Sequence, residues 1–152
     1  MRRVIFTCAF TLAAVCVPTS SSGQGAAEDA IVARTIAHMR SHLPAGRLAL
    51  DTTVVTRRAT IDVALSSNLE LTRLEDVVRC QSPMQCTMGA YTGVIGIQSV
   101  TSGESEAEVV ARGYKLIHKG DRSAFVMEER RICFEKRGGV WVITSSTVTR
   151  ES

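Results

Sequence analysis

The chain has 152 residues, with 18 basic and 15 acidic side chains and a formal net charge of +3 at pH 7. This length fits one domain with its own core. The near balance of charge excludes the concentrated basic surface that nucleic-acid binding requires. The pairs Arg130-Arg131 and Lys136-Arg137 alternate with glutamates and indicate a solvated strand face.

The first residues predict an export signal. Arg2 and Arg3 precede an uncharged, mostly apolar run over residues 4–17. A run of about 14 residues is too short to span a bilayer, which takes about 20, but it fits the apolar region of a signal peptide. Small polar residues follow, and we expect cleavage before Gln24. A buried helix and an uncleaved anchor are the alternatives.

Cleavage would leave a single α+β domain over residues 24–152. Removing residues 1–23 takes away two arginines, so 16 basic and 15 acidic side chains remain and the net charge becomes +1. The rest of the chain contains no second apolar segment long enough to span a membrane. We therefore expect the mature domain to work in the periplasm or outside the cell.

The first part of the domain predicts helices. Residues 28–43 carry apolar side chains at helical spacing, namely Val32, Ile36, Met39 and Leu43. Residues 59–69 predict a second, shorter helix, and residues 71–78 one or two further turns. Between the two main helices, residues 48–55 predict a short strand or an irregular segment.

After these helices the sequence predicts strands. Four runs rich in β-branched and apolar residues cover residues 92–100, 107–117, 123–135 and 140–149. The Gly138-Gly139 pair predicts a tight hairpin, because both central residues of a type I′ turn need positive φ. The predicted fold is N-terminal helices packed against a curved, antiparallel four-stranded meander.

The last hairpin also carries a family resemblance. Residues 131–143, RICFEKRGGVWVI, resemble the C-terminal hairpin of the cone-shaped superfamily of nuclear transport factor two and ketosteroid isomerase. The resemblance implies a cone-like fold with a pocket, and it does not imply one reaction. We expect Trp141, just after the turn, to lie in the core.

Enzymes of that superfamily use an acid or a tyrosine inside the mouth of the cone. The resemblance makes four residues available for such a role, Asp51, Asp62, Tyr91 and Tyr114. None of them lies in a motif that assigns it a function. We therefore predict no catalytic residue, and the chain carries no fingerprint for a cofactor.

Three cysteines remain after cleavage. Cys80 and Cys86 flank a five-residue loop, and in an oxidising compartment they should form a disulfide. Closing so short a loop is worth about 2–2.5 kcal/mol. Cys133 lies in a predicted strand between two apolar residues, where we expect a buried, reduced thiol. The alternative is a cross-link between the subunits of a homodimer.

The histidines do not predict a metal site. His38 and His42 are four residues apart on one face of the first helix, a spacing that metal ligands use, but no third ligand is evident. We expect both to lie on the polar face of the helix. His118 lies beside a predicted turn and should be solvated.

The function predicted from sequence is therefore an exported binding or interaction domain for a small apolar ligand or a protein partner. One alternative is a cone-fold enzyme of isomerase or hydratase type that uses an acid in the mouth. A second alternative is a protease inhibitor, because residues 98–103, QSVTSG, resemble the first inhibitory hairpin of cystatins.

Overall fold

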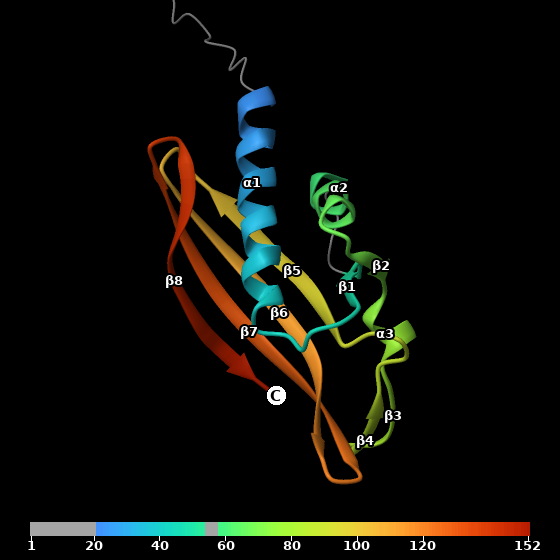
Figure 1. The fold of residues 1–152 in the computed structure, drawn as a ribbon. Coiled ribbons are helices and arrows are strands. Elements are labelled where there is room, and N and C mark those ends of the chain that lie inside the picture. The colour runs from blue at the N-terminus through green and yellow to red at the C-terminus, as the bar shows by residue number, and fades with distance from the viewer. Residues whose placement is uncertain (1–20, 54–57) are drawn as a thin grey trace, which may run out of the picture.

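The computed structural model describes residues 21–53 and 58–152 of the chain (Figure 1). The predicted export signal lies outside the described residues, except for residues 21–23, which begin the first helix. Residues 54 and 55 of the predicted strand lie outside them as well. Helix α1 starts at Ser21, so the predicted cleavage point before Gln24 falls within its first turn.

In chain order the elements are α1 (Ser21–Arg40), β1 (Leu48–Asp51), α2 (Arg58–Ser66), β2 (Glu70–Thr72), α3 (Leu74–Val77), β3 (Arg79–Ser82), β4 (Gln85–Thr87), β5 (Gly93–Ser102), β6 (Glu106–Lys119), β7 (Arg122–Arg137) and β8 (Val140–Glu151). The predicted helices and the four predicted long strands correspond to α1, α2 and β5 to β8. The segment after α2 forms the short strand β2 and the single turn α3.

The prediction of a four-stranded antiparallel meander is wrong. The strands form one curled, eight-stranded sheet in the order β2-β1-β5-β6-β7-β4-β3, with β8 also paired to β7. Strands β5 to β8 are antiparallel neighbours. Strand β1 runs parallel to both β2 and β5, and β4 runs parallel to β7, so the sheet is mixed.

The short strands explain the error. All four residues of β1, LALD, are buried, so the segment lacks the alternation by which a half-buried strand is recognised. Strands β2, β3 and β4 have only three or four residues, too few to show a period of two. The parallel pairings of β2 with β1 and of β4 with β7 are not hairpins, so no local turn signal marks them.

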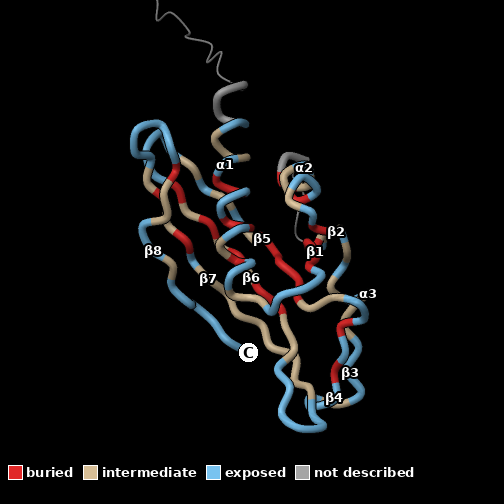
Figure 2. Tube along the Cα trace, viewed as in Figure 1, coloured by how far each residue is buried: buried red, intermediate tan, exposed pale blue. Residues whose placement is uncertain are grey.

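Helix α1 packs on one face of the long strands, which we call the inner face (Figures 1 and 2). Residues of β6 with odd numbers point toward α1, as the fully buried Val109 and Ala111 show. Trp141 is 3% exposed in the same core, which confirms the prediction for it. The opposite, outer face holds a second core that includes Met88 and Tyr114.

The predicted Gly-Gly hairpin is confirmed. Gly138 and Gly139 connect β7 to β8 with φ values of 57° and 82°. Positive φ at both positions is what a two-residue type I′ turn demands. This turn sets the pairing of β8 along β7, and the pairing carries the inward-facing residues of β8 back toward α1.

Candidate functional site

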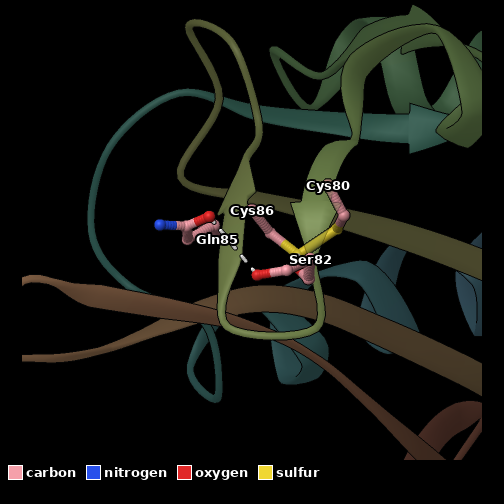
Figure 3. Close-up of a disulfide and its surroundings, with 4 residues drawn as sticks. All are labelled: Cys80, Ser82, Gln85 and Cys86. Atoms are coloured by element: carbon pink, nitrogen blue, oxygen red, sulfur yellow. Dashed lines mark hydrogen bonds between the residues drawn. A yellow bond between two sulfur atoms is a disulfide. The ribbon is translucent and has the colours of Figure 1, made fainter.

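The predicted disulfide is present. Cys80 and Cys86 pair across the β3–β4 hairpin with an S–S distance of 2.02 Å (Figure 3). Ser82 and Gln85 bracket the turn and their side chains are 3.4 Å apart. The hairpin docks beside β7 through a backbone hydrogen bond from Ser123 N to Met84 O. This disulfide suits an oxidising compartment.

Cys133 is free, as predicted, but the prediction that it is buried is wrong. Its side chain points to the outer face of β7 and is half-buried. It lines an open hollow of about 710 Å³, which Glu106, Glu108 and Glu135 also line. Cys133 lies between inward-facing Ile132 and Phe134, so strand alternation turns it away from the core.

The four acid and tyrosine candidates do not gather at one place. Asp51 is buried at the end of β1, where its carboxylate accepts hydrogen bonds from Thr53 and from the backbone of Leu74. Tyr91 donates a 2.9 Å hydrogen bond to Glu70. These contacts give Asp51 and Tyr91 structural roles in loops.

The other two candidates lie elsewhere. Tyr114 stacks on Phe125 in the outer-face core, with ring centroids 5.8 Å apart. Asp62 is exposed on α2. Among the described residues, the carboxyl groups of Glu70 and Glu129 have shifted pKa values, and hydrogen bonds from Arg47 and Arg112 respectively lower them. Neither carboxyl therefore has the raised pKa that the acid of the enzyme alternative requires.

A different set of polar side chains meets between the C-terminal end of α1 and the inner face of the sheet. We call this set the α1 cluster, and its members are His38, His42, Lys115, Glu128, Arg130 and Ser146. They come from α1 and the turn that follows it, from β6, from β7 and from β8. The long antiparallel pairing of β6, β7 and β8 brings them together.

Hydrogen bonds connect the helix to the last strand. His38 Nε2 lies 2.8 Å from Ser146 Oγ, and Arg130 Nη1 donates a 3.3 Å hydrogen bond to the same oxygen. Because Ser146 Oγ accepts from Arg130, its own proton can be donated to His38. In the tautomer of His38 that leaves Nε2 unprotonated, Ser146 donates and His38 accepts.

An ion pair lies beside this network. Arg130 Nε donates to Glu128 Oε1, and the two side chains are only 14% and 13% exposed. The prediction of one solvated, alternating strand face is wrong for these two residues. Glu129 and Arg131 point to the outer face instead, where they pair with Arg112 and Glu108.

Burial lowers the pKa of both histidines. For His38 the causes after desolvation are the neighbouring His42 and Arg130. For His42 desolvation again comes first, Arg130 and Lys115 also lower the pKa, and Glu128 opposes them. Both imidazoles are therefore neutral at pH 7. Lys115 Nζ donates to the backbone carbonyl of His42 at 3.5 Å, next to the negative end of the α1 dipole.

His42 carries an unused hydrogen-bonding atom. Its Nε2 is buried and has no hydrogen-bond partner within residues 21–53 and 58–152. The rings of His38 and His42 lie edge to face with centroids 4.8 Å apart. Buried polar atoms in native proteins usually have a hydrogen-bond partner, and a bound ligand can supply the one that His42 Nε2 lacks.

The α1 cluster does not fit a metal centre. In the described part of the chain, no group of three or more His, Cys, Asp or Glu residues could hold a metal ion. Arg130 also places positive charge beside both imidazoles, and Lys115 adds a second positive charge beside His42. The expectation that the histidines lie on the polar face of α1 is wrong, because both face the sheet. His118 is exposed as predicted and contacts Ser123 at 2.7 Å.

Most of this cluster was missed by the sequence reasoning, although β7 carries a signal for part of it. Phe134 and Ile132 are apolar and alternate, so the same face continues to Arg130 and Glu128. Two opposite charges on the continuation of an apolar face indicate a buried ion pair. Nothing local marks Ser146, because its position depends on how β8 pairs with β7.

Comparison of the chain with protein-family profiles, with curated proteins and with solved structures finds no match. The resemblances to the cone-shaped superfamily and to cystatins therefore stay predictions. Residues 98–102 of the cystatin-like segment lie in β5, and Gly103 begins the turn to β6. No helix in the described residues is long and apolar enough to cross a membrane.

Proposed function

We propose that this chain is an exported binding domain that holds the anionic group of a small organic ligand in the α1 cluster. The observation that carries the proposal is the buried, unpartnered Nε2 of His42, with the cations of Arg130 and Lys115 beside it. An unpaired buried polar group costs about 1–3 kcal/mol. A ligand oxygen that accepts from His42 Nε2 would remove this cost.

The charges around the cluster favour an anion. Arg130 and Lys115 bring two positive charges and Glu128 brings one negative charge, so the balance is one positive charge. Glu151 lies opposite Glu128 in the β7–β8 register, but it is exposed at the rim, where solvent screens its charge. Lys115 also balances the carbonyl end of α1 through its bond to His42 O.

Export is the second part of the proposal. The Cys80–Cys86 disulfide supports an oxidising compartment. Together with Arg2, Arg3 and the apolar run that follows, it supports the periplasm or the extracellular space. Mass spectrometry of the protein from its native host should show an N-terminus near Gln24. A cytoplasmic protein that still begins at Met1 would overturn this part.

The binding proposal is tested with acetate and inorganic phosphate as probe anions, followed by NMR of the histidine ring signals. We expect saturable shifts of His38 and His42, with dissociation constants on the order of millimolar for acetate. Arg130→Gln should weaken acetate binding about tenfold. Arg131→Gln, its neighbour on the outer face, is the matched control and should bind acetate as the unmodified protein does.

A second pair of variants keeps the test valid if Arg130→Gln does not fold. Lys115→Gln should weaken acetate binding, whereas Lys119→Gln, at the exposed end of β6, should not. Ring signals of His38 and His42 that do not respond to either anion would overturn the proposal. Equal binding by Lys115→Gln and Lys119→Gln would overturn it as well.

Acyl transfer is a second candidate function, favoured by the 2.8 Å contact between Ser146 Oγ and a neutral His38 Nε2. A serine with a base at this distance can act as a nucleophile. Its Oγ would bond to an ester carbonyl carbon while its proton moved to His38 and then left with the alcohol. Water would later release the acid and restore Ser146.

A fluorophosphonate probe separates this candidate from simple binding. Labelling at Ser146 that is lost in His38→Gln would establish the acyl-transfer candidate. An unlabelled Ser146 in a folded protein that binds acetate would exclude it and leave the binding function. Ser145→Ala, on the adjacent exposed position, is the control for nonspecific labelling.

A further inference from the structure

The inner face of the β6–β7 hairpin continues beyond the end of α1 (Figure 1). Gly113 lies directly under that end, because a Cβ there would meet Met39 Cε at 3.2 Å and Leu43 Cδ2 at 3.3 Å. Successive side chains of a strand alternate between faces. Lys115 and Ile117 therefore follow Gly113 on the inner face, past the end of the helix.

The register of the hairpin adds two residues of β7 to this face. Lys115 pairs with Val126, and Ile117 pairs with Ala124. We call Ile117, Ala124 and Val126 the apolar strip. It begins next to Glu128 of the α1 cluster, and the five residues from Glu128 to Ala124 span about 13 Å of strand.

Among the described residues, the apolar strip packs against neither core, whereas apolar residues on the other face of the same hairpin pack against the second core. Ile117 is 40% exposed, and Ala124 and Val126 are half-buried. On the outer face, Leu116 and Phe125 pack into the second core. A contiguous row of apolar side chains beside a polar cluster is a candidate binding surface.

Lys115 lies between the α1 cluster and the apolar strip. Its ammonium group reaches the carbonyl of His42 at 3.5 Å, so its charge lies toward the α1 cluster. The aliphatic stem of a lysine covers apolar surface while its charge stays with polar partners. Positive charge is thus placed at the end of the strip that lies nearest α1.

We propose that the ligand of the α1 cluster is an amphiphile with one carboxylate head and a short, unbranched aliphatic chain. The head lies against Arg130, Lys115 and His42, and the chain lies along the apolar strip. The inference rests on the proposed binding function. A singly charged head matches the net charge of one positive unit that Arg130, Lys115 and Glu128 create together.

A chain-length series tests the inference. The probes are acetate, butanoate, hexanoate and octanoate, with 1-hexanol and 1-octanol as uncharged counterparts, each below its micellar concentration. We expect affinity to rise about two- to fourfold per methylene, because full burial of a methylene contributes about 0.8 kcal/mol. Each alcohol should bind at least tenfold more weakly than the carboxylate of the same length.

One substitution tests the contribution of the ligand's aliphatic chain separately from that of its carboxylate. Val126→Thr keeps a β-branched side chain and makes the strip polar, so octanoate should bind severalfold more weakly while acetate binding stays the same. Val110→Thr, on the outer face of β6, is the matched control and should leave the whole series unchanged.

The outcomes distinguish the two proposals. If acetate binds at the α1 cluster and octanoate binds no more tightly, the apolar-chain inference is overturned and the binding function stands. If alcohols bind as tightly as carboxylates and Arg130→Gln has no effect, the strip binds apolar chains but the anion-binding function is overturned. If no probe binds, both are overturned.

Discussion

His38 and Ser146 are 108 residues apart in sequence, and their side chains meet at 2.8 Å between α1 and β8. This contact links the first described helix to the last strand. Arg130 donates to the same serine and ties the pair to the ion pair with Glu128. The polar network thus forms only when the helix and the long strands are all in place.

The first prediction concerns the stability of that network. Arg130→Gln should lower the free energy of unfolding by about 1–3 kcal/mol, since it removes one partner of a largely buried ion pair. Arg131→Gln removes an exposed partner of Glu108 and should cost less than about 1 kcal/mol. Urea denaturation of both variants checks the difference. Equal losses would show that the inner-face pair is effectively solvated.

The second prediction concerns pH. Both His38 and His42 have pKa values lowered below 6.5 by burial and by Arg130, so the unfolded chain binds more protons just below that pH. The free energy of unfolding should therefore fall as pH drops through 6.5, and this contribution should level off below the folded pKa values.

The double variant His38→Gln/His42→Gln isolates this effect. Carboxylates titrate in both proteins, so the difference in slope between them reports the two histidines. Chemical denaturation at a series of pH values between 7.5 and 5 should give a shallower dependence for the variant. Identical dependences would show that the histidines titrate alike in the folded and unfolded states.

The third prediction concerns the core. Trp141→Ala should cost about 3–5 kcal/mol, because the side chain is 3% exposed and packs beneath α1. Val140→Ala, one residue earlier and 48% exposed, is the matched control and should cost less than about 1 kcal/mol. Thermal or urea unfolding measures both. A small effect of Trp141→Ala would place this hairpin outside the cooperative core.

The fourth prediction concerns the cysteines. Non-reducing peptide mapping should yield the Cys80–Cys86 pair, and Cys80→Ala should lower stability by about 2 kcal/mol through loss of the short cross-linked loop. Cys133→Ala leaves the disulfide intact and serves as the control. Because Cys133 is half-buried in an open hollow, a neutral maleimide should label it in the folded protein. Labelling only after denaturation would contradict this.

Local patterns in the sequence were enough to predict the long strands, the Gly138-Gly139 turn, the buried Trp141 and the disulfide. Each of these depends on neighbours within a few residues. The parallel pairing of β1 with β2 and β5 could not be predicted this way, because β1 is four buried residues with no alternation. Because such short strands show no local pattern, the predicted sheet had four strands where the structure has eight.

The same distinction between local patterns and long-range pairing applies to the residues of the α1 cluster. The spacing of His38 and His42 placed them on one face of the first helix, but the prediction that this face is the solvated, polar one was wrong. Arg130 and Glu128 could have been predicted from the alternation of β7, whereas Ser146 required the register of β8.

The most direct test of an anion site in the α1 cluster is an NMR pH titration of His38 and His42 with and without saturating acetate. Arg130 places positive charge beside both imidazoles, and His42 also has Lys115 beside it, with Glu128 as the opposing charge. A bound carboxylate would favour the protonated rings, so acetate should raise both pKa values, and Arg130→Gln should reduce this rise. Unchanged pKa values at saturating acetate would contradict the proposed site.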